Sequence, residues 1–156
     1  MPASSLDLPA LSQAIKDWGR ELGFQQVGIA GLDLASHEAH LQRWLAAGYH
    51  GEMDYMAAHG NKRSRPDELV PGTLRVISLR MDCLPGDTQM SQRLGEPEKA
   101  YVSRYALGRD YHKLIRKRIQ QLAERIQQAI GPFGYRAFVD SAPVLEKAIA
   151  EQAGLG

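Results

Sequence analysis

A run of aromatic and charged residues stands out between positions 101 and 112, in the sequence YVSRYALGRDYH. It contains three tyrosines, two arginines, one aspartate and one histidine. Between Arg104 and Arg125 there are seven lysines and arginines but two acidic residues, in a chain whose formal net charge is +1. Cations contact phosphates and flat rings stack on bases, so the segment suits a phosphate-bearing partner. A solvated helix face has the same composition, and both interpretations stay open at this point.

Asp140 is the second candidate, because it ends an apolar run that predicts a short strand over 136–139. The carboxyl ends of strands are where α/β sheets place their sites. Burial there would favour the protonated carboxyl, which could donate a proton to a reacting group. The alternative is that Asp140 or Ser141 caps the following helix, whose positive end would favour the anion instead.

The remaining candidates are weaker. A basic cluster at 61–65, Asn-Lys-Arg-Ser-Arg, suits phosphate or carboxylate oxygens but equally suits a solvated surface. The five histidines have no compact ligand spacing, so we expect no metal site in this chain. Cys83 is the single cysteine, and one thiol cannot form an internal disulfide, a zinc cage or an iron–sulfur cluster. The sequence contains no glycine-rich dinucleotide or P-loop motif.

Helices and strands alternate along the chain, which predicts an α/β or α+β sheet layered with helices. Apolar residues at helical spacing predict helices over 8–22, over 36–47 with Ser36 as N-cap, over about five turns from Tyr111 to Gly131, and over 144–153. A short helix is predicted around 53–58 and an exposed polar loop over 85–99. Strands are predicted over 26–30, 75–80, 101–103 and 136–139.

Length and composition set the outer limits. The chain has 156 residues, enough for one domain, with 44% hydrophobic and 24% charged residues, an ordinary globular balance. No apolar run is long enough to span a bilayer, and the N-terminus has no secretory signal pattern. We therefore expect a cytoplasmic protein that does not contact membranes, and a monomer.

Several long segments together resemble the N-terminal region of the epoxyqueuosine reductase family. The resemblance spans nearly the whole chain, is weakest over 85–99, and rests on LGFQQVGIA, YHGEMDYMAAHGNKRSRP, PGTLRVISLRM, YVSRYALGRDYHKLIRKR and VDSAPVLEKAIAEQAGLG. It implies a truncated cobalamin-binding domain over 1–156, with a nitroreductase-like core similar to the reductive dehalogenases: a mixed sheet flanked by helices. It also implies a following ferredoxin-like domain with two four-iron four-sulfur clusters.

The resemblance implies an activity as well. Family members reduce epoxyqueuosine to queuosine at the wobble position of certain tRNA anticodons, the last step of queuosine synthesis, so tRNA is the implied partner. Asp140 matches the family's proton donor and a cofactor contact, and Arg63 and Ser103 match cobalamin-contacting positions. A further block of residues that is characteristic of the family also matches this chain, and the resemblance implies that these positions contact tRNA or the cofactor. They are Arg104, Tyr105, Arg109, Tyr111 and His112.

The cluster cysteines of the family are absent from these 156 residues, so we expect that this chain alone does not complete a reductive cycle and that it exposes apolar edges. The electron donor is not indicated. Three alternatives remain at this point: a non-catalytic module that binds RNA or anions through the Arg104–Arg125 segment, a flavin- or nitroreductase-like enzyme, and an inactive fragment.

Overall fold

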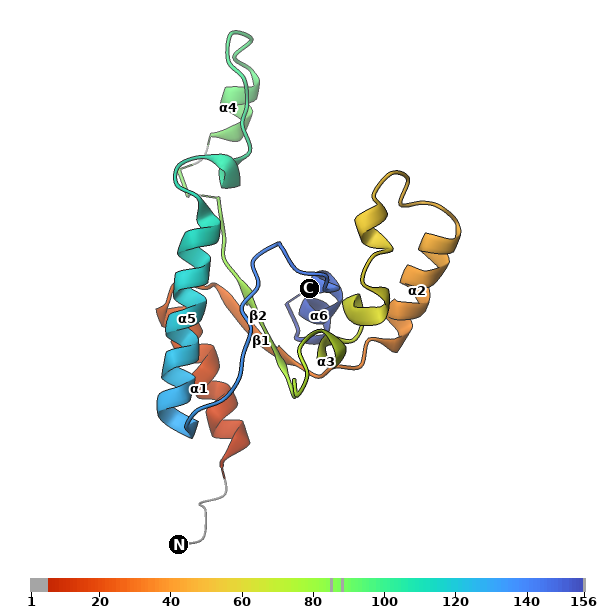
Figure 1. Cartoon of the computed structure of the whole chain (residues 1–156). Helices are drawn as coiled ribbons and strands as arrows, with labels where there is room; N and C mark the ends of the chain where they lie inside the picture. Colours follow the sequence, from red (N-terminus) through yellow and green to blue (C-terminus); the bar gives the residue numbers. More distant parts are fainter. Residues whose placement is uncertain (1–5, 85, 88, 156) are drawn as a thin grey trace, which may run out of the picture.

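The computed structural model describes residues 6–84, 86–87 and 89–155, and it forms a mixed α/β fold around a small sheet (Figure 1). The α-helices are α1 (Leu8–Glu21), α2 (Ala35–Ala46), α3 (Pro66–Leu69), α4 (Met90–Leu94), α5 (Tyr111–Ile130) and α6 (Glu146–Gln152). The strands are β1 (Gln26–Ala30) and β2 (Val76–Arg80), and three 3-10 turns are η1 (Asp54–Met56), η2 (Gly60–Arg63) and η3 (Arg104–Ala106). No helix within these residues is long and apolar enough to cross a membrane.

The sheet has two antiparallel strands, with Gly28 of β1 opposite Ser78 of β2. Side chains alternate between its two faces, as the strand period requires. Val27 faces the first core cluster, whereas Ala30 belongs to a second cluster on the other face. Both faces are therefore covered, and this explains why the two strands read as short apolar runs.

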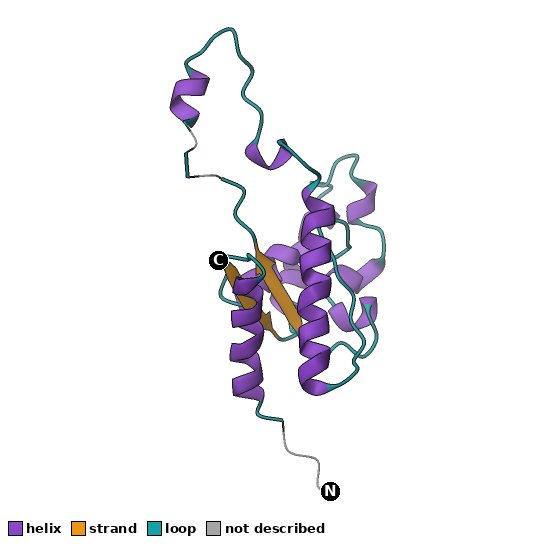
Figure 2. Cartoon of the chain, turned by 90° about the vertical axis from the view of Figure 1, so that its left-hand side faces the viewer, coloured by secondary structure: helices purple, strands orange, loops and turns teal. Residues whose placement is uncertain are grey.

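Helices α1 and α5 cover one face of the sheet and run side by side (Figure 2). Asp7 caps α1 by accepting a hydrogen bond from the backbone N–H of Ala10 at 3.0 Å, which satisfies one of the free donors of the first turn. The core between the helices and β1 consists of Ile15, Phe24, Val27, Leu122 and Ile126. Most of the periodic apolar residues that predicted both helices pack here, but Leu8, Leu114 and Ile130 are exposed.

Helix α6 covers the opposite face, where Ile149 packs with Ala30 and Leu34. Its approach is close at Gly28, where a Cβ atom would lie 2.4 Å from the backbone oxygen of Ala153. The helix begins at Glu146, two residues after the predicted start at 144. It ends at Gln152, one residue before the predicted end at 153. Leu145 is its N-cap residue, so the predicted capping by Asp140 or Ser141 is wrong.

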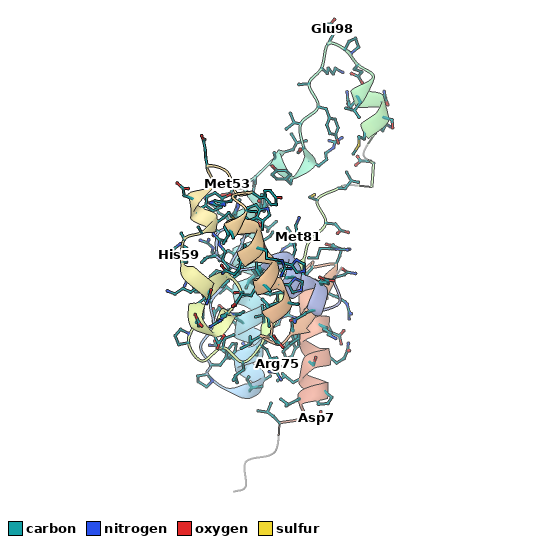
Figure 3. The ribbon with its side chains drawn as sticks, turned by 90° about the vertical axis from the view of Figure 1, so that its right-hand side faces the viewer. Asp7, Met53, His59, Arg75, Met81 and Glu98 are labelled. Carbon is teal, nitrogen blue, oxygen red and sulfur yellow. The ribbon has the colours of Figure 1, made fainter. Side chains whose placement is uncertain are left out.

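The segment between α2 and α3 forms a separate lobe beside this sandwich, on which Figure 3 labels Met53 and His59. The predicted helix near 53–58 is a single 3-10 turn, η1. The predicted Ser36 cap is wrong, because Leu34 is the N-cap residue and the carboxylate of Asp33 accepts from the N–H of Ala35 at 3.0 Å. An aspartate just before the helix thus satisfies one of the free donors of its first turn.

Two predicted strands are absent from the described residues: 101–103 and 136–139 have no strand conformation. A strand forms only where a neighbouring strand supplies hydrogen bonds. Residues 101–103 lie on an arm that carries α4 and projects away from the sheet, with Glu98 near its tip (Figures 1 and 3). The predicted loop over 85–99 is this exposed arm, except that it contains α4 and that positions 85 and 88 lie outside the described residues.

Candidate active site

Asp140 lies in the irregular connection between α5 and α6, with its backbone in the left-handed region at φ 56°. Its side chain is 52% exposed, so the burial expected from the sequence is wrong. The expectation failed because it assumed a strand end packed against the sheet, and residues 136–139 form no strand. Asp140 is instead a surface acid in a conformation that costs a non-glycine residue about 1–3 kcal/mol.

The first turn of α5 holds the carboxyl of Asp140. The hydroxyl of Tyr111 donates a hydrogen bond to Oδ2 of Asp140. The Nε2 atom of His112 lies 3.5 Å from the same oxygen, within ion-pair distance. Tyr111 and His112 are the first two residues of the 20-residue helix α5, so a regular element presents both groups to the irregular connection that carries the acid.

Asp110 fixes this turn as the N-cap of α5. Its Oδ1 accepts from the backbone N–H of His112 at 3.0 Å and contacts Nδ1 of the same residue at 2.9 Å. The ring of His112 also stacks on Tyr111, with centroids 4.1 Å apart. The imidazole therefore lies between two carboxyl groups, Asp110 on one side and Asp140 on the other.

These contacts shift the ionisation of the groups around Asp140. The pKa of Tyr111 is raised to about 12, mainly by the hydrogen bond to Asp140 and secondly by burial, so its hydroxyl stays a donor at neutral pH. Hydrogen bonds from His112 lower the pKa of Asp110, which stays ionised. At the start of α6, burial and then the charge of Asp140 raise the pKa of Glu146. The motif YVSRYALGRDYH contained all of these groups except Glu146, which no sequence pattern indicated.

The residues before α5 extend the site. Tyr105 in η3 meets the edge of Tyr111, with ring centroids 6.0 Å apart. The guanidinium of Arg104 lies 5.9 Å from the ring centre of Tyr101, and its buried Nε has no acceptor within the described residues. The structure thus groups Arg104, Tyr105, Tyr111, His112 and Asp140 in one region. Ser103 and Arg109, both exposed, flank this group along the chain, and neither is among the side chains that contact Asp140.

Arg63 has a different environment, since it is buried with 8% exposure. Its guanidinium donates to the backbone oxygens of Tyr55 and Met56, the latter at 3.2 Å, and lies over the Tyr55 ring. Its own backbone oxygen accepts from the N–H of Leu145 at 2.9 Å. Arg63 therefore connects the lobe between α2 and α3 to the start of α6.

Two further residues of the basic cluster at 61–65, Ser64 and Arg65, are also used within the fold. Ser64 and Arg65 both donate to the carboxylate of Glu38 on α2, Arg65 through Nε at 3.0 Å and Nη2 at 2.9 Å. Arg65 also pairs with Glu68 at 2.8 Å. The hydrogen bonds from Arg65 and then Ser64 lower the pKa of Glu38. The anion recognised by these residues is a side chain of the protein itself.

An open cavity of about 730 Å³ lies between α2 and α6. Its walls are mainly apolar, with Leu41, Trp44 and Met56 facing Leu145 and Ala148, and Glu146 among its polar groups. The described residues include no group of three side chains that could hold a metal ion, and Cys83 is exposed.

Comparisons with known proteins agree on one family. The family model described as "Epoxyqueuosine reductase QueG, DUF1730" matches residues 63–141. The epoxyqueuosine reductase of Pseudomonas aeruginosa is 83% identical over 150 residues, which are 96% of this chain and 42% of that protein. The one from Escherichia coli is 60% identical over 151 residues, 97% of this chain and 40% of that protein. The chain thus spans about two fifths of the length of these curated relatives.

Solved structures show the same fold at low sequence identity. A structure of epoxyqueuosine reductase from Streptococcus thermophilus matches with a TM-score of 0.71 and 20% identity, over 97% of this chain and 40% of that one. A structure of the Bacillus subtilis enzyme, with its catalytic loop swung out of the active site, matches with a TM-score of 0.75 and 19% identity, over 96% of this chain and 39% of that one.

Proposed function

Because this chain belongs to the epoxyqueuosine reductase family, we propose that it is the N-terminal part of an enzyme that reduces epoxyqueuosine to queuosine in tRNA. The matched region, 63–141, includes both the first turn of α5 and Asp140. The observation that carries the proposal is the contact between these two, an acid held by Tyr111 beside His112. The alternative of a non-catalytic RNA- or anion-binding module is not favoured, because the named relatives are reductases.

The reaction defines what the protein must supply. Removing the epoxide oxygen leaves an alkene and water, which takes two electrons and two protons. Amino-acid side chains do not supply electrons at low potential, so a redox cofactor must do so. The chain's own contribution is to orient the substrate and to protonate the departing oxygen. We assign that protonation to Asp140, whose half-exposed carboxyl is accessible to a bound nucleoside.

Cobalamin, when bound, would supply the reducing electrons. Two features of the chain fit a large cofactor fringed with amides: the buried Nε of Arg104, which lacks an acceptor within the described residues, and the mainly apolar cavity beside α6. We propose that Arg104 and Ser103 contact it through polar groups. Arg63 already uses its guanidinium within the fold, so its proposed contribution is to support the wall of the cavity at Leu145. The iron–sulfur clusters need ligands outside these 156 residues, which contain one cysteine.

We propose that tRNA approaches over the N-terminal half of α5. Lys113, Arg116 and Lys117 are exposed there at spacings of three and four residues, which place them on one side of the helix beside the acid. Arg109 precedes the helix and is exposed as well. Phosphate contacts of this kind position a nucleic acid without reading its sequence. The wobble-position substrate, the cytoplasmic location and the monomeric state remain predictions.

The test uses the complete protein with Asp140→Asn, and exposed Asp87→Asn as a matched control. The variant should bind cobalamin with an unchanged absorption spectrum, while conversion of epoxyqueuosine to queuosine in tRNA, measured by mass spectrometry of the nucleosides, falls by about 10²-fold or more. The Asp87 variant should convert tRNA normally. Normal conversion by Asp140→Asn would remove this residue from the mechanism.

A further inference from the structure

We propose that His112 is a positioning residue that orients Asp140 and resupplies its proton after each turnover. This inference rests on the proposed function, since it concerns the acid assigned there. An acid that gives its proton to a leaving oxygen ends as a carboxylate and must be recharged before the next substrate. His112 is the titratable side chain that contacts Asp140 and also has a second, separate anchor.

The anchor fixes the orientation of the ring. Asp110 accepts from the backbone N–H of His112 at 3.0 Å, and the same oxygen lies 2.9 Å from Nδ1 of its ring. Because Asp110 is ionised and can only accept, Nδ1 carries a hydrogen. The second ring nitrogen, Nε2, is therefore the one that exchanges a proton, and it faces Oδ2 of Asp140 at 3.5 Å.

The proton balance of the step is simple. In the imidazolium form, the Nε2–H bond breaks as an O–H bond forms on Asp140, and the imidazole becomes neutral with its hydrogen on Nδ1. No electrons are exchanged. The imidazole then takes a proton from water at Nε2, which solvent can reach because the side chain of His112 is 42% exposed.

Tyr111 contacts the same carboxyl but has a different task. Its hydroxyl keeps its proton at neutral pH, so it acts as a fixed hydrogen-bond donor to Asp140 and does not relay protons. The other charged or titratable groups around His112 are Asp110 before the helix, Tyr105 in η3 and Lys113 in the first turn of α5. Glu146 at the start of α6 feels the charge of Asp140.

The experiment measures multiple-turnover reduction of epoxyqueuosine in tRNA by the complete protein as a function of pH, because only repeated cycles require the acid to be recharged. We expect His112→Ala to slow the reaction by about 10²-fold, to lose one ionisation from the pH–rate profile, and to be rescued by free imidazole in proportion to the imidazolium concentration. Binding of tRNA should be unchanged. Tyr111→Phe should slow the reaction but keep the pH–rate profile. The control is His59→Asn, which should match the wild type, because His59 is exposed and asparagine tolerates its left-handed backbone conformation.

A second readout does not depend on activity. In protein with isotope-labelled histidine, the neutral form of the His112 ring should carry its hydrogen on Nδ1, and Asp110→Ala, which removes the accepting oxygen, should abolish that preference. An unaltered rate and pH profile in His112→Ala, or a loss through weaker tRNA binding without imidazole rescue, would overturn the proposal. If Asp140→Asn is inactive while His112→Ala is normal, only this inference fails. If Asp140→Asn is active, the proposed function of the acid fails.

Discussion

At the scale of single residues, the conformation of Asp140 is the feature that most needs an explanation. A non-glycine residue at φ 56° is strained, and such residues gather at functional sites, where the surrounding structure holds them in place. Here the hydroxyl of Tyr111 supplies that restraint. Asp140 is thus a strained residue held by its hydrogen bond, which distinguishes it from the carboxylates that stabilise the fold. Glu38 is the clearest example of those.

Glu38 contributes a pH-dependent part of the stability. Its pKa in the folded protein is lowered below the usual 4.5 by Arg65 and Ser64, so its contribution is present above that value and is lost as pH falls through the folded pKa. Glu38→Gln should therefore lower the thermal unfolding midpoint at neutral pH, and the difference from wild type should shrink in acid. Glu52→Gln is the control, because Glu52 is exposed, and it should change neither the unfolding midpoint nor the dependence of that midpoint on pH. A gap of constant size at all pH values would contradict this account.

At the scale of elements, the connection from α5 to α6 is placed by helices at both ends. Asp110 fixes where α5 begins, and so fixes where Tyr111 and His112 stand. Helix α6 is fixed by its contact with the sheet, where Gly28 allows the backbone at Ala153 to come close. The irregular residues between them need no secondary structure of their own to hold the acid.

The close contact at Gly28 can be tested directly. Gly28→Ala would place a Cβ atom 2.2 Å from a side-chain methyl of Leu155 and 2.4 Å from the backbone oxygen of Ala153, so α6 must shift. We expect a loss of about 1–3 kcal/mol in the free energy of unfolding, measured by denaturant titration. Gly31→Ala is the matched control, since nothing lies within 4 Å of its Cβ position. Equal stability of the two variants would show that α6 does not pack as described.

At the scale of the whole molecule, α1 and α5 lie on one face of the sheet and α6 lies on the other. The exposed residues Lys113, Arg116 and Lys117 of α5 follow directly after the two residues that contact Asp140. The projecting arm begins and ends near the same end of α5 (Figure 1). Exposed apolar side chains lie on this arm, at Leu84, Met90, Leu94 and Val102, and also outside it, for example at Leu8 and Leu74. The basic side of α5 therefore begins at Lys113, next in the chain to His112, which contacts the proposed acid.

If tRNA binds this surface, removing charge should weaken binding and its dependence on salt together. The double variant Lys113→Gln and Lys117→Gln in the complete protein should reduce the slope of log affinity against log salt by roughly 1–2. Filter binding or anisotropy at several salt concentrations would measure it. Arg20→Gln, which removes a cation already paired with Asp17, is the control. An unchanged slope in the double variant would place the tRNA elsewhere.

The sequence alone determined the elements whose periodicity is local. Helices α1, α2 and α5 and strands β1 and β2 were predicted within one or two residues, because apolar spacing reflects which side of an element is buried. The motif from Tyr101 to His112 was likewise recognised from its composition. The resemblance implied contact of this motif with tRNA or cofactor, whereas the contacts of Tyr111 and His112 with Asp140 were not predicted.

Only the tertiary structure decided what those residues contact. Strand formation at 101–103 and 136–139 depended on partners that local sequence cannot supply, so both predictions were wrong, and the burial of Asp140 was wrong with the second. The use of Arg63 and Arg65 within the fold depended on Tyr55, Met56 and Glu38 arriving from other segments. The contact between His112 and Asp140 joins the first turn of α5 to the connection before α6, and contacts between segments so far apart in the sequence are set by packing.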